Sequence, residues 1–143
     1  MASLEFEKIV EDFELLEEWE DRYKYIIDMG KQLPIFDESL KSSETKVDGC
    51  ASQVWIFAEA KSDGNSKTLE FQGDSDAVIV KGLIALLISL YNNVLLKDLS
   101  KINAVDELSR LDLDQHLSSQ RSNGLFHMVE RIKLLARANS ESD

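Results

Sequence analysis

The residue best suited to covalent chemistry is Cys50, the single cysteine among 143 residues. A thiolate can attack a sulfur atom held by another molecule, and such exchange needs only one cysteine on each partner. Cys50 follows Gly49, and glycine permits a sharp backbone turn, so we expect the thiol at a loop tip. The alternative is inert packing, because an unpaired cysteine often behaves as a small hydrophobic side chain.

The surroundings of Cys50 in sequence do not favour the thiolate. Asp48 is expected to raise the pKa of the thiol, and Lys46 is expected to offset that effect.

Other site chemistries find little support. One cysteine and two distant histidines, His116 and His127, give no zinc-binding spacing. An iron–sulfur cluster generally needs four ligands, mostly cysteine thiolates, so this chain alone is not expected to hold one. A Cys-His catalytic pair stays open, although no pattern supports it. Phosphate-loop, GxGxxG and GxSxG patterns are absent. We therefore predict no metal and no cofactor, and no self-contained enzyme.

Arg121 is a second candidate for function, because of its place near the start of a predicted helix. It lies three residues after Ser118, the expected N-cap. The helix dipole disfavours a cation in the first turn. A residue that breaks a local rule is a candidate for a functional role. We expect Arg121 either to hold the Cys50 loop by hydrogen bonds to its backbone carbonyls, or to favour the Cys50 thiolate and a charged group of a partner. The alternative is an ordinary exposed arginine.

Charge narrows the range of partners. The chain carries 27 acidic against 16 basic residues, a net charge of −11, which disfavours nucleic acid and anionic membranes. Nine acidic residues lie between Glu5 and Asp21, opposed only by Lys8. Such a run indicates a solvated helix face, and the alternative is a surface that attracts a basic partner.

Composition indicates a protein of the reducing cytoplasm. Apolar residues make up 43% and charged residues 30%, a soluble globular profile. The single cysteine fits a reducing compartment, and the acidic start does not resemble a signal peptide. The most apolar stretch, 78–96, is interrupted by Lys81, Asn92 and Asn93, so it predicts a buried core helix and no membrane span.

Hydrophobic periodicity predicts the elements that must position these residues. Helices are expected over about 6–16, behind the N-cap Ser3, and over about 19–30, with Gly30 as the C-terminal stop. A loop follows over 37–48. Alternation over 53–61, a turn at 63–66 and a second strand through Leu69 and Phe71 predict a β-hairpin.

The second half is predicted to be helical. The segment 73–76 ends the hairpin and offers a helix cap, and the next helix, 79–90, is apolar nearly all round and should form the centre of the core. Gly82 and Gly124 lie inside predicted helices, which indicates close packing of a neighbour. A short helix over 105–111, a last helix from Ser118 and a polar tail, 139–143, complete the chain. This order predicts an α+β class, with helices packed on a small antiparallel β-sheet, in one domain spanning 1–143.

Four blocks of sequence together resemble the SufE family of sulfur-acceptor proteins. They occur in family order and span about 6–138; the blocks are 19–34, 47–55, 73–83 and 116–125. The second block holds the cysteine; it reads Val47-Asp48-Gly49-Cys50-Ala51-Ser52-Gln53-Val54-Trp55. Its stretch after Asp48 resembles SufE more than the related protein of the Csd system. At Ser119 the family commonly has a proline, and serine also permits a helix start.

The resemblance implies a specific activity and specific partners. SufE-like proteins work beside a pyridoxal-phosphate cysteine desulfurase such as SufS, which forms a persulfide on its own cysteine. The cysteine that corresponds to Cys50 takes the outer sulfur, which stimulates the desulfurase, and the sulfur passes to a SufB-containing scaffold complex for iron–sulfur cluster assembly. The implied fold resembles that of the IscU scaffold. We also expect supporting or partner-binding roles for four further residues; these are Gly49, Asp74, Asp76 and Arg121.

Two other classes of function stay open at this point. The first is a non-catalytic adaptor that binds a desulfurase or scaffold through its acidic first helix, with Cys50 as inert packing. The second is a thiol redox protein, which is disfavoured because Cys-x-x-Cys is absent and Cys50 has no resolving partner.

Overall fold

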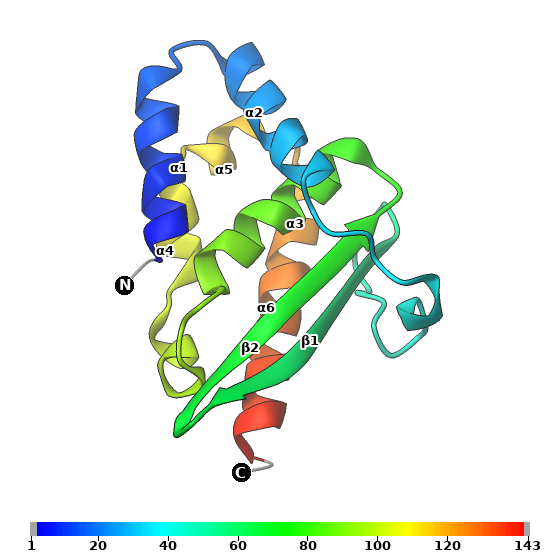
Figure 1. Cartoon of the computed structure of the whole chain (residues 1–143). Coiled ribbons are helices and arrows are strands. Elements are labelled where there is room, and N and C mark those ends of the chain that lie inside the picture. Colours follow the sequence, from blue (N-terminus) through cyan, green and yellow to red (C-terminus); the bar gives the residue numbers. More distant parts are fainter. Residues whose placement is uncertain (1–2, 142–143) are drawn as a thin grey trace.

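The computed structural model describes residues 3–141 and confirms the predicted α+β class (Figure 1). Helices pack on a two-stranded antiparallel sheet. In chain order the elements are α1 (Leu4–Leu15), α2 (Trp19–Lys31), the 3₁₀ helix η1 (Glu38–Leu40), β1 (Val54–Asp63), β2 (Ser66–Ser75), α3 (Val78–Tyr91), the 3₁₀ helix η2 (Leu96–Lys101), α4 (Ala104–Ser109), α5 (Leu113–His116) and α6 (Ser119–Glu141).

Helices α1 and α2 form an antiparallel pair at the N-terminal side. As predicted, Ser3 caps α1, and its hydroxyl oxygen accepts a hydrogen bond from the Phe6 N–H at 3.1 Å. At the other end of α1, the Arg22 guanidinium donates to the carbonyls of Phe13 and Leu16 at 2.9 and 2.8 Å. Arg22 thus satisfies carbonyls that the end of a helix leaves without partners. These bonds connect the end of α1 to α2.

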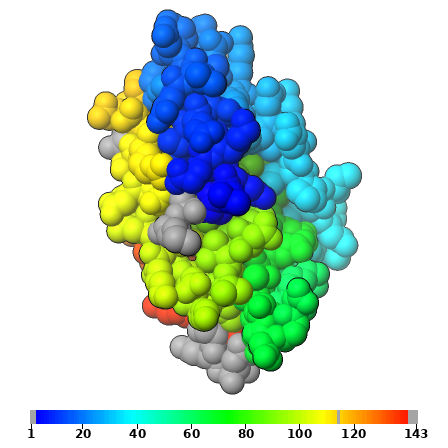
Figure 2. Space-filling view, turned by 60° about the vertical axis from the view of Figure 1, so that its left-hand side comes forward, coloured from blue at the N-terminus to red at the C-terminus, as the bar shows by residue number. Residues whose placement is uncertain are grey.

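The acidic run is at the surface, as expected for a solvated helix face. Figure 2 shows the N-terminal segment covering the upper part of one face of the molecule. Glu7 is bound by Arg110 through a bidentate pair at 2.7 and 2.8 Å, and Asp12 accepts bonds from Lys8 and Tyr25. Most of the other acidic side chains of the run are exposed.

The predicted hairpin is present, and its buried face is apolar. Strands β1 and β2 pair from Val54↔Ser75 to Asp63↔Ser66 around a two-residue turn. Alternate side chains on one face are buried; they are Val54, Ile56, Leu69 and Phe71. A lone hairpin is marginal in water, so its stability depends on the helices that cover this face.

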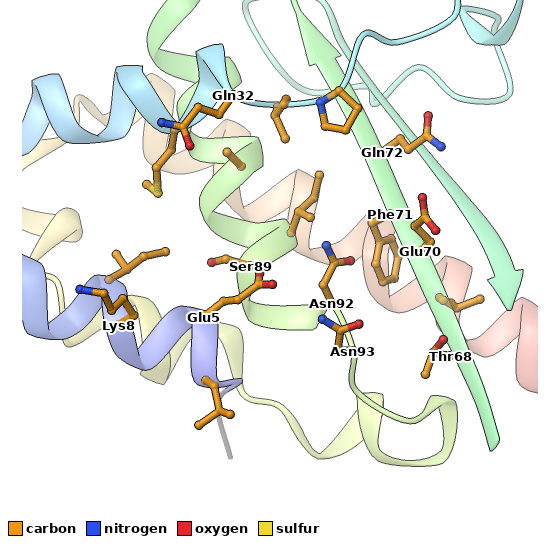
Figure 3. A pocket seen from close by; sticks show the side chains of 18 of the residues that line it. Glu5, Lys8, Gln32, Thr68, Glu70, Phe71, Gln72, Ser89, Asn92 and Asn93 are labelled. Carbon is orange, nitrogen blue, oxygen red and sulfur yellow. The ribbon is translucent and has the colours of Figure 1, made fainter. Parts of the chain in front are cut away.

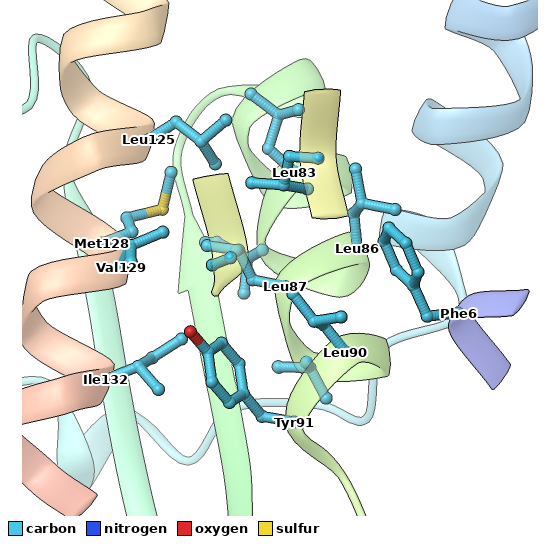
Figure 4. Packing of buried hydrophobic residues seen from close by; sticks show 14 of the residues in the cluster. Phe6, Leu83, Leu86, Leu87, Leu90, Tyr91, Leu125, Met128, Val129 and Ile132 are labelled. Carbon is cyan, nitrogen blue, oxygen red and sulfur yellow. The ribbon is translucent and has the colours of Figure 1, made fainter. Parts of the chain in front are cut away.

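Helix α3 is the centre of the core, as its apolar character predicted. Figure 4 shows its leucines packed between α6 and the Phe6 side chain of α1. Leu86, Leu87 and Leu90 are fully buried. Within residues 3–141, no helix is long and apolar enough to cross a membrane.

Two glycines bring α2 and α3 into backbone contact. A Cβ built on Gly30 would lie 2.7 Å from the backbone nitrogen of Gly82, and one on Gly82 would overlap the Ile26 carbonyl. The prediction that Gly30 ends its helix was wrong, because α2 continues to Lys31. Gly30 is required for close packing, the role that the sequence indicated for Gly82.

Three further boundaries differ from the sequence predictions. The loop expected over 37–48 contains η1 and a bridge between Lys46 and Trp55. The helix expected over 105–111 is α4, which ends at Ser109. A further short helix, α5, was not predicted; it follows Asp112, which adopts a left-handed conformation with φ of 57°. The tail expected over 139–143 is helical to Glu141, because no helix breaker interrupts this segment; residues 142 and 143 lie outside the described part.

Truncation of Leu86 tests whether α3 forms the core. Leu86→Ala should lower the free energy of unfolding by roughly 2–5 kcal/mol, because it leaves a cavity at a fully buried site. Val78→Ala is the matched control, since Val78 lies in the same helix and is 59% exposed. Urea denaturation measures both variants. Equal midpoints for the two would contradict a central position for α3.

Candidate functional site

Cys50 lies in a short connection that we call the cysteine loop, residues 48–53. The chain before the loop pairs with the start of β1: the Val47 N–H donates to the Val54 carbonyl at 2.8 Å, and the Ile56 N–H donates to the Thr45 carbonyl at 2.9 Å. The loop therefore connects two antiparallel segments, as a hairpin loop does. Loops held by a rigid scaffold commonly carry functional groups.

The sharp turn expected at Gly49 is present. Gly49 has a φ of 90°, in the left-handed region that favours glycine. A Cβ at this position would also lie 2.5–2.7 Å from three atoms of the His127 ring. Glycine is thus required both for the backbone conformation and for the contact with α6.

The Cys50 thiol is half-buried against α6. Its Sγ lies 3.6 Å from the Gly124 carbonyl, a weak hydrogen bond from the thiol, and a Cβ on Gly124 would lie 3.5 Å from Sγ. Gly124 therefore contacts Cys50, but a Cβ at this position would make only an ordinary van der Waals contact, so the close packing predicted for both helix glycines is found at Gly82 and not at Gly124.

Burial raises the pKa of the Cys50 thiol, and the charge of Asp48 raises it further. The Asp48 effect expected from sequence is present, whereas Lys46 does not offset it. Cys50 is therefore protonated near neutral pH. A neutral thiol is a poor nucleophile, so the free protein holds its reactive group in a resting state.

A pocket of about 280 Å³ adjoins Cys50. Ser118, Gln120 and Arg121 form one side of it, at the start of α6, and Val80, Leu83 and Met128 add apolar wall. A larger pocket of about 910 Å³ lies between α1, the end of α2, β2 and α3 (Figure 3). The larger pocket includes neither Cys50 nor Arg121. Both residues line the smaller pocket, so we place the candidate site there.

Arg121 shares the pocket of Cys50 but does not bind the cysteine loop. Ser118 is the N-cap of α6, as predicted, because its hydroxyl accepts a bond from the Arg121 N–H at 3.2 Å. The Arg121 side chain is exposed, and within residues 3–141 its guanidinium has no hydrogen bond or ion pair. The expected bonds from Arg121 to loop carbonyls are therefore wrong for this free protein.

Arg131 makes the carbonyl bonds that were expected of Arg121, and sequence reasoning missed it. Its guanidinium donates to the carbonyls of Glu44 and Lys46 at 3.2 and 2.8 Å. These carbonyls belong to the segment that leads into the cysteine loop. Arg131 follows Gly124 by seven residues, so both lie on one face of α6. That spacing is the signal that could have indicated it.

Asp76 binds the other end of the cysteine loop. Its carboxylate accepts a hydrogen bond from the Gln53 N–H at 3.0 Å, and its own N–H donates to the Gln53 carbonyl at 3.3 Å. The prediction that segment 73–76 caps the next helix is therefore wrong: neither Asp74 nor Asp76 caps α3 with its side chain. The N-cap of α3 is Ala77, without a side-chain bond.

Asp74 lies in β2 and forms ion pairs with two lysines from other elements. Lys41 and Lys81 approach its carboxylate at 3.1 and 3.6 Å, and the Lys41 ammonium also lies 4.7 Å from the centre of the Trp55 ring. Burial acts to raise the pKa of Asp74, but the hydrogen bonds from Lys41 and the Ser75 N–H, together with the lysine charges, lower it overall. Asp74 thus ties the segment after η1 to β2 and α3.

The arrangement can form a covalent adduct on the Cys50 sulfur. Among the described residues, no group of three or more histidine, cysteine or acidic side chains could hold a metal ion. The site offers one thiol, a polar pocket beside it and one exposed cation. Such a set suits transfer of a small group to and from a thiol.

Comparison with known proteins places this arrangement in a family. Residues 7–136 match the family described as "SufE: Fe-S metabolism associated domain". A protein of Rhizobium meliloti (strain 1021) is 46% identical over 133 residues, 93% of this chain and 94% of that protein. One of Rhizobium etli is 43% identical over 140 residues, 98% of this chain and 93% of that protein. Both relatives are named as uncharacterized SufE-like proteins.

A solved structure shares the fold. The solution structure of a hypothetical protein from Thermus thermophilus matches with a TM-score of 0.71 over 96% of this chain and 97% of that chain, at 17% sequence identity. This chain therefore belongs to the SufE family, which is associated with Fe–S metabolism, and the resemblance seen in its four sequence blocks is confirmed.

The pH dependence of Cys50 alkylation tests the electrostatics of the site. The rate with iodoacetamide should rise with pH, and its midpoint should lie above that of an ordinary thiol, because burial and Asp48 raise the pKa. Asp48→Asn should move the midpoint down without reaching the ordinary value, since burial remains. Asp63→Asn, at the exposed hairpin turn, is the control. A midpoint in the parent protein at or below the ordinary value would contradict this account.

Proposed function

We propose that this protein accepts a sulfur atom on Cys50 from a SufS-type cysteine desulfurase. It then passes the sulfur to a SufB-containing scaffold complex for iron–sulfur cluster assembly. The observation that carries the proposal is the placement of the sole thiol, half-buried in a loop and beside a polar pocket of about 280 Å³. Family membership supports the same conclusion.

The transfer step is an exchange at sulfur. The Cys50 thiolate attacks the outer sulfur of the persulfide on the desulfurase; the sulfur–sulfur bond of the donor breaks, and the donor cysteine leaves as a thiolate. The outer sulfur keeps its proton, and Cys50 becomes a persulfide. No external oxidant or reductant is consumed, because the sulfur–sulfur bond that forms replaces the one that breaks.

The resting state of Cys50 fits a carrier that acts only on its partner. In the free protein the thiol is half-buried and its pKa is raised, so reaction with small molecules is slow near neutral pH. Transfer requires Sγ to leave the Gly124 carbonyl and approach the donor. A contact with the desulfurase that opens the cysteine loop would also remove the burial that holds the pKa high.

The lone cysteine supports storage of the transferred sulfur. A second nearby thiol would attack a Cys50 persulfide, form an internal disulfide and release the transferred sulfur. The sequence contains no second cysteine, so this loss does not occur within the chain.

Arg121 lies at the pocket with a guanidinium that binds no described residue, and it is available to an anionic group of the partner.

A non-catalytic adaptor is the second candidate, and the exposed acidic surface of α1 and α2 favours it. In that case the protein would bind a desulfurase or scaffold while Cys50 served only as packing. The two candidates differ in one measurable product, the persulfide on Cys50.

Intact-mass measurement tests sulfur acceptance. After incubation with a SufS-type desulfurase and free cysteine, the protein should gain the mass of one sulfur atom, and dithiothreitol should remove it. Cys50→Ser should fold, gain no sulfur and fail to stimulate the desulfurase, because it lacks the acceptor. Ser52→Ala, a change in the same loop that keeps the thiol, should load normally. Full binding without a mass change would favour the adaptor instead.

Replacement of Arg121 tests its role toward a partner. Arg121→Ala should leave the melting temperature unchanged or slightly raised, since it removes a cation from the first turn of α6. Stimulation of the desulfurase should fall by roughly tenfold, the scale of one lost charge-assisted hydrogen bond. Lys97→Ala, an exposed cation on η2 that does not line the Cys50 pocket, is the control. Equal stimulation by both variants would show that Arg121 is an ordinary surface residue.

A further inference from the structure

The cysteine loop and the segment before it pack against one face of α6. Gly124, His127, Met128 and Arg131 follow one another at spacings of three, one and three residues, so they lie on one side of the helix. Gly124 contacts Cys50, His127 contacts Gly49, and Met128 lines the pocket beside Cys50. Arg131 binds the segment that enters the loop.

The ends of the cysteine loop and its middle are held in different ways. Val47 and Val54 close its base by a backbone hydrogen bond, and Asp76 binds Gln53. Between these points, residues 48 and 49 form a turn, and residues 50–52 belong to no helix or strand. The middle of the loop contacts α6 at two points, through the weak Cys50–Gly124 bond and the packing of Gly49 on His127, and Cys50 also packs against the edge of the hydrophobic core.

Gly49 packs closely against the ring of His127. The ring lies so close to Gly49 that a single methyl group would not fit between them: the ring atoms Cδ2, Nε2 and Cγ are 2.5, 2.6 and 2.7 Å from a Cβ built on Gly49. The ring is half-buried, and the Phe126 ring lies beside it, with the ring centres 5.9 Å apart in an edge arrangement. Phe126 itself is 51% exposed.

We propose that His127 is a positioning residue for Cys50: its ring packs against Gly49, holds the cysteine loop closed on α6, and so sets how often the thiol is exposed. Cys50 adjoins Gly49, so movement of Gly49 away from the ring takes Sγ away from the Gly124 carbonyl. The reactivity of Cys50 in the free protein is then the reactivity of the open loop multiplied by the open fraction. The inference deepens the proposed function, because the same opening would precede sulfur transfer.

Alkylation of the free, full-length protein tests this role without any desulfurase. His127→Ala should raise the rate of Cys50 alkylation by iodoacetamide about tenfold, the scale of one lost contact between packed residues. The melting temperature should change little, because the ring lies outside the central core. Phe126→Ala is the matched control, since it removes the neighbouring ring, and it should alkylate at the parent rate.

A second ring variant separates packing from the chemistry of the imidazole. His127→Phe keeps a planar ring but neither titrates nor donates a hydrogen bond, so it should alkylate close to the parent rate. A rate for His127→Phe equal to that of His127→Ala would overturn the proposal, because the imidazole group and not its bulk would then matter. A parent-like rate for His127→Ala would also overturn it.

The pair of Gly49 and His127 provides an independent measurement. Gly49→Ala should also speed alkylation, because its methyl group meets the ring and the residue is strained at a φ of 90°. In the double variant, the gain should be smaller than the product of the two single gains, since one contact is lost in both. A gain equal to the product would overturn the proposal. Sulfur loading is measured separately, so a protein that alkylates as expected yet accepts no sulfur would contradict only the proposed function.

Discussion

Eleven of the fourteen residues of α3 are buried, and α1, α2, β2 and α6 all pack against this helix. The burial of its apolar side chains is the main source of the hydrophobic free energy that the small hairpin cannot supply alone. Helices α2 and α3 approach so closely that Gly30 and Gly82 leave no room for a Cβ. A side chain at either glycine would therefore displace the helix on which every layer of the fold depends.

The candidate site is built at the edge of this core. Helix α6 packs its apolar face on α3, as Figure 4 shows, and its next face carries the residues that touch the cysteine loop. The entrance of the loop is tied to α6 through Arg131, and its exit is tied to the start of α3 through Asp76. The position of the thiol thus follows from the packing of two helices. The two ends of the cysteine loop are bound by side chains of the core elements, whereas Cys50 itself makes only a weak hydrogen bond. Such a loop can move its thiol without disturbing the fold.

Local patterns predicted much of the fold. The alternation through Val54 and Ile56 indicated the hairpin, the continuous apolar run indicated α3, and Ser118 marked the start of α6. These signals depend on neighbours within a few residues, so a single sequence is enough to show them. Gly30 was misassigned because a helix-ending glycine and a packing glycine look alike until the opposing helix is known.

The candidate site was predictable only in part. Cys50 and Gly49 stood out by residue type, and the four sequence blocks indicated the family. The partners of the cysteine loop did not stand out, because Arg131 bonds to carbonyls that lie 85 and 87 positions away in sequence. A contact of that separation depends on the tertiary fold, and carbonyl acceptors carry no residue signature. Arg121 was assigned those bonds for the same reason: both arginines lie on α6, and spacing alone did not show which one faced the chain before the loop.

The fixed base of the cysteine loop limits how far the thiol can travel. Val47 is paired with Val54 at the base of the loop, and Cys50 is three residues beyond Val47; an opening that keeps this pair intact is limited by the length of those three residues. A fully extended chain spans at most about 3.6 Å per residue, so the Cα atom of Cys50 can stand no more than roughly 11 Å from that of Val47. The loop is therefore a short tether and not a swinging arm. If the donor cysteine of a partner lies at the bottom of a cleft deeper than this reach, the donor cysteine itself must move toward Cys50.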